Sequence, residues 1–217
     1  MMKNDKPLAS ELQRKYVHRT KFLLNDQIIF QNNEKLISLV DDDDHNVYLN
    51  VNKSKAYRNE IDKGLRLGTF LYESGWFEHS LQVLNVTRQL IVELDDNYGK
   101  LLLLLSCLQK LLHAQALFCC FKDASITTSQ ALSLIEQIHG LHKSGQIKNE
   151  ENRSMTAGIP NSFLVNFYYE LSTLHYSRSE YDLSYKWAVK ALEYLSNDTP
   201  HKVTIDAIRQ AAKSCVV

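Results

Sequence analysis

Glycine and proline are scarce in this chain, which has 7 Gly and 3 Pro among 217 residues. An all-β fold needs many turns, and glycine and proline build a large share of them. The scarcity therefore favours helices joined by few tight connections. Hydrophobic residues make up 44% of the chain, which is ample for the core of one domain.

An excess of charge of one sign is also lacking. The 25 basic and 25 acidic residues give a formal net charge of zero. Nucleic acids and anionic membrane surfaces attract strongly basic proteins, so the balance predicts no nucleic-acid partner.

No long hydrophobic run is present. The strongest one begins at 101–105, but Gln109, Lys110, His113 and Gln115 interrupt it, whereas a membrane span needs about 20 apolar residues. We therefore expect no membrane insertion, and a helix that is buried on nearly every side. The first residues lack the apolar core of a signal peptide, which predicts a cytoplasmic protein.

The four cysteines, Cys107, Cys119, Cys120 and Cys215, show no metal-ligand spacing. We expect them to be small apolar residues on buried helix faces in a reducing compartment. His139 and His142 share a helix face without a third ligand, and no nucleotide-binding or nucleophile-elbow motif occurs. The sequence thus predicts no enzyme and no catalytic, metal or cofactor site.

Apolar periodicity predicts helices along most of the chain. Two fall in an N-terminal region, residues 1–53, with a solvated acidic loop at 41–44 after them. The long polar stretch 144–160 is either a functional loop or a mobile insertion within a second domain, 54–217. The expected ranges are 9–24, 27–40, 54–74, 77–94, 98–121, 127–143, 161–178, 181–196 and 201–216.

Two glycines reveal a repeat. Gly68 and Gly75 lie in or beside a helix, where glycine costs about 1 kcal/mol relative to alanine. Tetratricopeptide repeats place glycines there, at a close helix crossing and in a turn with positive φ. The positions that follow the offsets of this repeat are Leu67, Gly68, Leu71, Gly75, Phe77, Ser80, Leu84 and Thr87.

The same offsets recur downstream. Serine replaces both glycines in the second window, and a half window, Ile208, Ala211, Ala212 and Cys215, resembles the first helix of one more repeat. The register of helices 98–121 and 127–143 stays open. The second window comprises Tyr168, Leu171, Ser172, His175, Ser179, Tyr181, Ser184, Ala188 and Ala191. The pattern predicts an all-α, right-handed superhelix of tetratricopeptide-like hairpins.

Three stretches, 74–77, 185–192 and 208–217, resemble a family of tetratricopeptide adaptors that is similar to kinesin light chains. The resemblance spans roughly 56–217 and implies a cytoplasmic adaptor with cytoskeletal and nuclear associations. It implies binding of the amyloid precursor protein tail, association with microtubules in protein transport, and substrate reception for a cullin-2 ubiquitin ligase through elongin. The family's elongin-docking region has no recognisable counterpart in residues 1–55.

Ligands of such repeats usually lie against the first helix of each pair. Among the residues that the offsets put there, Arg209 and Lys213 are four positions apart and suit a peptide carboxylate. The predicted peptide-binding residues are Arg66, Tyr72, Asn166, Tyr169, Tyr176, Arg209 and Lys213. Two functions stay open: a peptide-binding adaptor, and a structural spacer without a groove of its own.

Overall fold

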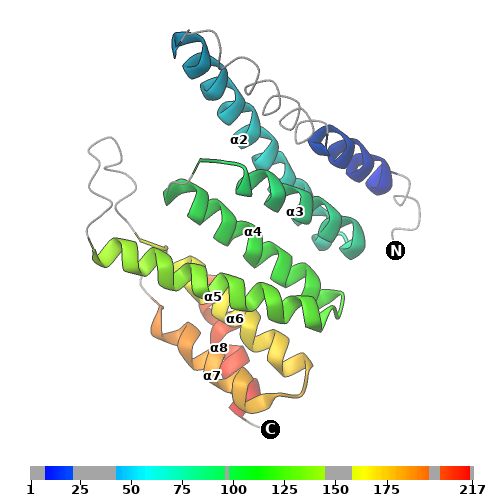
Figure 1. Ribbon diagram of the computed structural model, residues 1–217. Coiled ribbons are helices and arrows are strands. Elements are labelled where there is room, and N and C mark those ends of the chain that lie inside the picture. Colours follow the sequence, from blue (N-terminus) through cyan, green and yellow to red (C-terminus); the bar gives the residue numbers. More distant parts are fainter. Residues whose placement is uncertain (1–7, 22–42, 96–97, 145–157, 196–200, 216–217) are drawn as a thin grey trace. The chain divides into compact units, whose positions relative to one another are not determined.

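The computed structural model describes residues 8–21, 43–95, 98–144, 158–195 and 201–215 (Figure 1). Every secondary-structure element in these ranges is a helix. After helix 8–21 come α2 (Asp43–Glu73), α3 (Phe77–Val92), α4 (Tyr98–Leu117), α5 (Phe121–Lys143), α6 (Asn161–Ser177), α7 (Tyr181–Glu193) and α8 (His201–Cys215). The predicted all-α fold of helical hairpins is confirmed, and its right-handed superhelical course stays a prediction.

Two helix boundaries differ markedly from those expected. Helix α2 begins at Asp43 and not at residue 54, so Asp43 and Asp44 are helical. Carboxylates are stabilised at a helix N-terminus by the helix dipole, which is why an acidic run can open a helix as well as a loop. Helix α5 begins at Phe121, with Asp123 in its first turn, six residues earlier than predicted. The expected helix 27–40 and most of the loop 144–160 lie outside the described residues.

The chain forms two compact units, Met1–Phe118 and Cys119–Val217. The division predicted between residues 53 and 54 falls within α2 and stays a prediction. Among the described residues, no helix has both the length and the hydrophobicity that crossing a bilayer requires.

Unit 1 is organised around the close crossing of α2 and α3. A Cβ atom at Gly68 would lie 2.5 Å from Cδ2 and 2.6 Å from Cγ of Leu84, which is fully buried. The Ser80 hydroxyl donates a hydrogen bond to the Gly68 carbonyl at 2.8 Å across the same crossing. The predicted reason for Gly68 is thus confirmed.

Helix α4 packs against α3 in unit 1. Burial raises the pKa of Cys107 to about 12, so the thiol keeps its proton and donates to the Leu84 carbonyl at 3.5 Å. The prediction of buried cysteines is correct for Cys107 and wrong for Cys119 and Cys215, which are exposed. Cys119 occupies a turn, and Cys215 lies on an uncovered side of α8.

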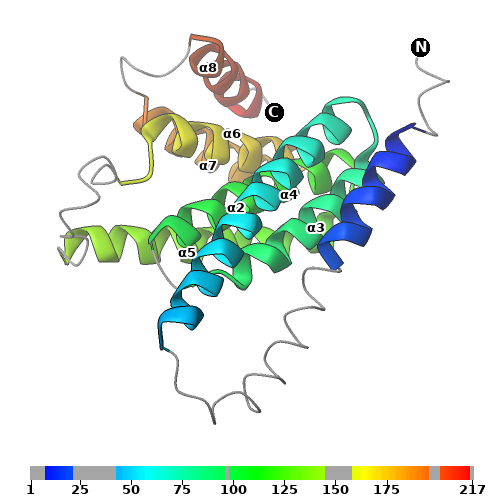
Figure 2. The same cartoon turned by 90° about the horizontal axis from the view of Figure 1, so that it is seen from above.

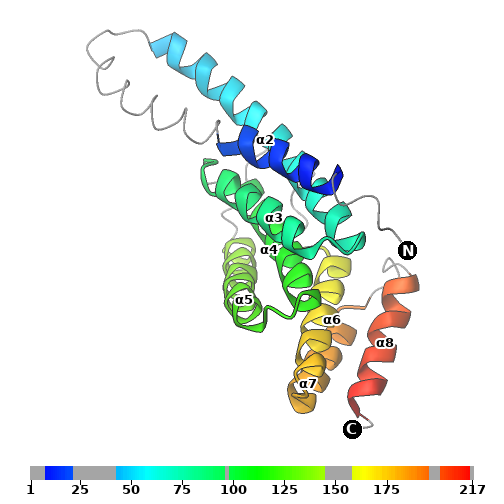
Figure 3. The same ribbon diagram turned by 90° about the vertical axis from the view of Figure 1, so that its right-hand side faces the viewer.

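In unit 2, α6, α7 and α8 pack against one another (Figure 3). Serine side chains connect them. The hydroxyls of Ser172 and Ser184 lie 3.0 Å apart, and each also donates to the other's backbone carbonyl, at 2.7 and 2.8 Å. The Ser184 hydroxyl lies 2.7 Å from that of Ser214 on α8. Since serine is small, these helices approach closely while the three serine hydroxyls stay hydrogen-bonded.

Helix α8 leaves part of its surface uncovered. Ala207, Gln210 and Ser214 are buried, whereas Ile208 is 51% exposed, and Ala212 and Cys215 are also exposed. The uncovered residues are those that the repeat offsets assign to the contact with a following helix.

Three turns share one backbone form and fix the register of the repeats. Gly75, Cys119 and Ser179 have φ of 82°, 59° and 61°. In the first and last of these turns, Trp76 N–H donates to the Leu71 carbonyl, and Glu180 N–H to the His175 carbonyl, as in a Schellman motif. The positive φ predicted for Gly75 is confirmed. Cys119 is the equivalent residue between α4 and α5, which places Leu112 at the position of Gly68.

Candidate functional site

In unit 1 the candidate site comprises residues of α2 and α4 on the side predicted to hold ligands. The rings of Tyr72 and His113 are in contact, with centroids 4.8 Å apart and planes tilted by 57°. Burial lowers the pKa of His113, the Glu73 carboxylate opposes this effect, and Lys110 adds to it. The neutral ring is therefore favoured, and it can donate or accept a hydrogen bond at its two nitrogens.

Arg66 is already engaged within its own helix. Its Nε lies 3.1 Å from Oδ1 and 3.0 Å from Oδ2 of Asp62, and the two side chains are 81% and 56% exposed. An exposed pair of this kind contributes little to stability, so Arg66 can exchange Asp62 for a ligand carboxylate at small cost.

In unit 2 the candidate residues come from α6 and α8, which pack against each other. Asn166 and Tyr169 are partly buried on α6, and Thr173 on the same helix donates to the Tyr169 carbonyl at 3.1 Å. Arg209 and Lys213 are exposed on α8 and make no ion pair within the described part of the chain. Their predicted role in binding a peptide carboxylate stays a prediction.

Gln210 lies between these two cations in sequence. It is 5% exposed, and its Nε2 is buried without a hydrogen-bond partner. The repeat offsets gave no reason to single it out, because glutamine at this position reads as an ordinary helix surface residue.

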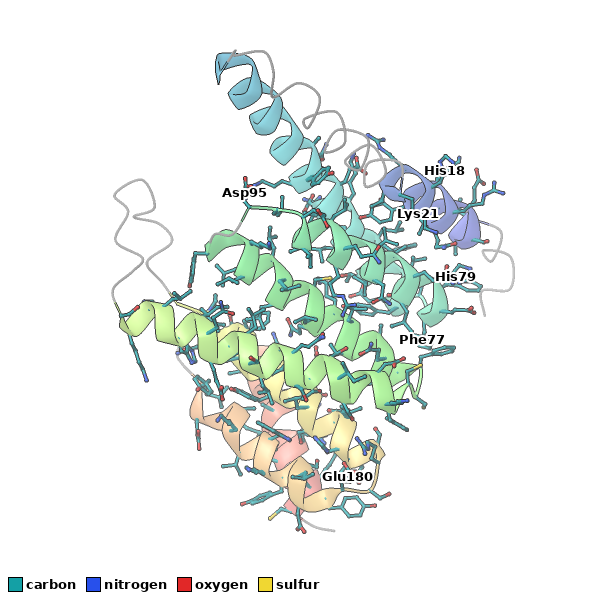
Figure 4. The ribbon with its side chains drawn as sticks, in the orientation of Figure 1. His18, Lys21, Phe77, His79, Asp95 and Glu180 are labelled. Carbon is teal, nitrogen blue, oxygen red and sulfur yellow. The ribbon has the colours of Figure 1, made fainter. Side chains whose placement is uncertain are left out.

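Other predicted residues are used inside the protein. The Tyr176 ring packs edge-on against Tyr181 with centroids 5.4 Å apart, which fixes the end of α6 to the beginning of α7. In the turn between them, Glu180 Oε2 lies 2.7 Å from Nδ1 of His175, and its Oε1 lies 2.9 Å from Arg178 (Figure 4). Tyr176 therefore has a structural role that sequence reasoning did not assign.

His113 and Lys110 were missed as candidates because the register of α4 was open. The signal was nevertheless present in the sequence. Phe121 precedes Ala124 by three residues, as Phe77 precedes Ser80 (Figure 4) and Tyr181 precedes Ser184. Aligning these aromatic residues puts His113 at the position of Thr69, on the predicted ligand side of α4.

The metal-site alternative has no support in the described ranges. They contain no group of three or more His, Cys, Asp or Glu side chains that could hold a metal ion. His142 lies instead against Gly158, whose Cβ, if present, would be 3.5 Å from His142 Cδ2.

The helical hairpins, the close crossing at Gly68 and the recurring positive-φ turn are features expected of the tetratricopeptide adaptors that the sequence resembles. The sequence is similar to that of amyloid protein-binding protein 2. The rat and mouse proteins of this name are each 29% identical to it over 170 residues. This alignment covers 78% of the chain and 26% of each relative, so the chain spans about a quarter of their length. No protein-family model matches the sequence.

The suspected relationship to amyloid protein-binding protein 2 is thereby supported. Both relatives carry the name of a binding protein and not of an enzyme.

Proposed function

We propose that this chain is a protein-binding adaptor that holds peptide segments against the first helices of its repeats. The observation that carries the proposal is the pair Arg209 and Lys213, exposed on α8 without a carboxylate partner in the described chain. Charge-assisted hydrogen bonds are about twice as strong as neutral ones, so a carboxylate is the group that this pair favours. Asn166 and Tyr169 supply an amide and an aromatic ring on the adjoining α6.

Unit 1 offers a complementary surface for side chains of the ligand. Tyr72 and His113 present two rings in contact, and Arg66 presents a second cation. Aromatic side chains and arginine are the residue types most often found at binding hot spots. Each unit thus carries its own set of ligand groups.

The finer roles come from the related proteins. By similarity to amyloid protein-binding protein 2, we propose that the ligand is the cytoplasmic tail of the amyloid precursor protein. We further propose that the chain associates with microtubules in protein transport and acts with elongin and cullin-2 components as a ubiquitin-ligase substrate receptor. The cytoplasmic, cytoskeletal and nuclear locations belong to the same proposal.

A structural spacer is the second candidate. The contact of Tyr176 with Tyr181 favours it, because the Tyr176 side chain then serves the fold and not a ligand.

Fluorescence titration with one peptide in free-acid and amidated forms separates the two functions. An adaptor binds the free acid more tightly, and the Arg209→Ala/Lys213→Ala variant loses about tenfold or more in affinity for it, since the loss of even one charged contact costs about 1.5–3 kcal/mol. The Lys122→Ala/Lys186→Ala variant, which removes the same charge elsewhere in unit 2, serves as the matched control. A spacer shows no preference between the two peptides and no difference among the variants.

The partner is then identified by comparing tubulin, elongin–cullin-2 components and the amyloid precursor tail as prey for the immobilised chain. Retention of one of them by the wild type, and its loss in the Arg209→Ala/Lys213→Ala variant, assigns that partner to this site.

A further inference from the structure

Helix 8–21 lies beside α2 and α3 of unit 1 (Figure 2), and its Ala9 and Tyr16 are buried together with Leu71 and Val83. We call the surface of α2 and α3 that it covers the α2–α3 groove. Ala9, Gln13, Tyr16 and Thr20 face the groove at spacings of four, three and four residues. This is the pattern by which an amphipathic helix binds in a groove of another protein. His18 and Lys21 are exposed on the same helix (Figure 4).

One end of the groove is apolar. Leu71 and Val83 are buried there with Ala9 and Tyr16, and Leu67 and Trp76 pack around them. Leu67 and Trp76 stay partly accessible at this end.

The middle of the groove is shaped for an aromatic hydroxyl. The Tyr16 hydroxyl lies 3.0 Å from the Glu60 carbonyl, to which it can donate, and 2.9 Å from Thr87 Oγ1. Gly64 makes room for this contact, because a Cβ atom there would collide with both the Tyr16 hydroxyl and Thr87 Oγ1.

A buried carboxylate forms the other end. Glu60 is 3% exposed, and its Oε1 lies 3.1 Å from Arg19 of helix 8–21 and 2.8 Å from Lys63 of α2 itself. If helix 8–21 leaves, Lys63 still pairs with Glu60, so an open groove contains no uncompensated buried charge.

The contacts of helix 8–21 are mostly ones that water can replace. Besides the apolar contacts of Ala9, Tyr16 and the partly buried Val17 they are hydrogen bonds and an ion pair, and Leu8 and Leu12 stay 57% and 38% exposed. A net hydrogen bond is worth only about 1 kcal/mol, and a free helix of this length is marginal in water. A partner helix with a larger apolar contact in the same place would compete with helix 8–21 for this surface.

We propose that the α2–α3 groove is a helix-binding site for a partner protein, and that residues 8–21 are an autoinhibitory segment that occupies it when no partner is present. The partner helix carries a small or medium apolar residue, an aromatic hydroxyl seven positions later and a cation three positions after that. This order matches the apolar end, the Gly64 recess and Glu60. The site differs from the side of α2 that is predicted to hold ligands and does not rest on the function proposed for that side.

The test uses the full chain and a fluorescein-labelled synthetic peptide with the sequence of residues 8–21. Tyr16→Ala in the chain frees the groove, so its affinity for the peptide is expected to rise about tenfold or more over the wild type, since a groove that is nine-tenths occupied has its apparent affinity reduced tenfold. Glu11→Ala, on the exposed side of the same helix, is the matched control and leaves the wild-type affinity unchanged. The Tyr16→Phe variant, which loses only the hydroxyl, falls between the two.

Adding Gly64→Ala to the Tyr16→Ala chain locates the binding. The new methyl group occupies the place of the hydroxyl, so the affinity is expected to fall again by about tenfold, while circular dichroism and Trp76 fluorescence verify that unit 1 is folded. Equal peptide affinity in wild type, Tyr16→Phe and Tyr16→Ala overturns autoinhibition. Equal affinity with and without Gly64→Ala overturns the groove as the site.

Discussion

Replacing Gly68 by alanine tests the close crossing of α2 and α3. The added Cβ would lie 2.5 Å from Cδ2 and 2.6 Å from Cγ of Leu84. Moving one methyl group cannot relieve both contacts, and Leu84 is fully buried, so the helices must separate slightly. Overpacking costs about 1–3 kcal/mol, while alanine improves helix propensity by about 1 kcal/mol. We expect Gly68→Ala to lower the free energy of unfolding by about 1 kcal/mol, and Gly68→Leu by about 2–3 kcal/mol.

The effect of Gly68→Ala on the free energy of unfolding should change sign when Leu84 is replaced by a shorter side chain. Leu84→Ala leaves a cavity and costs about 2–5 kcal/mol by itself. In that background the methyl group of Gly68→Ala fills part of the cavity and keeps its propensity gain, so it is expected to stabilise by about 1 kcal/mol. The coupling energy between the two positions is then about 2 kcal/mol.

Urea unfolding followed by tryptophan fluorescence measures these changes unit by unit. Trp76 reports on unit 1 in a Trp187→Phe background, and Trp187 reports on unit 2 in a Trp76→Phe background. The control is Gly140→Ala in α5, where no atom lies within 4 Å of the added Cβ and a gain of about 0.4–1 kcal/mol is expected. If Gly68→Ala stabilises as Gly140→Ala does, the crossing is not close and the reasoning is wrong.

Three further predictions follow from the turns, the serine contacts and the buried histidine. Gly75→Ala is expected to cost about 1–2 kcal/mol in urea unfolding, because φ at this position is 82° and alanine rarely adopts it; an unchanged midpoint would show that the turn relaxes. Ser184→Ala removes the hydroxyl that contacts Ser172 and Ser214, but both serines keep a backbone carbonyl acceptor, so the expected cost is about 0.5–1.5 kcal/mol; an unchanged free energy of unfolding would mean that the hydroxyl contributes little. Because burial lowers the pKa of His113 below 6.5, the unfolded chain binds its proton more tightly; stability is full above about pH 6.5 and falls below it, and His113→Gln should flatten that fall in melts recorded across this range.

The fold was predictable at positions where the local backbone or packing requires one particular residue type. Glycine in or beside a helix lowers its stability. Gly68 and Gly75 therefore predicted a close helix crossing and a turn with positive φ, and both occur. The register of α4 and α5 was not predictable in the same way. Cys119 adopts the turn conformation without being glycine, because the helices on either side of it impose a φ of 59° that its side chain tolerates.

The candidate site was likewise predictable only in part. Offsets identified Arg66, Tyr72, Arg209 and Lys213, because the face of a helix follows from its 3.6-residue period. They could not reveal that His113 contacts Tyr72, because that contact depends on which helices become neighbours. The pairing of Asp62 with Arg66, by contrast, follows from their spacing of four residues on one helix.

The sequence by itself determined that this protein is helical and repetitive, since periodicity, scarce turn residues and local glycine requirements are properties of neighbouring positions along the chain. Only the tertiary structure decided that residues 8–21 fill the α2–α3 groove. That contact joins Tyr16 to Thr87, 71 residues away, through a recess that exists only because Gly64 lacks a side chain. A contact over such a separation depends on shape and hydrogen-bonding complementarity between packed surfaces, which no local pattern encodes.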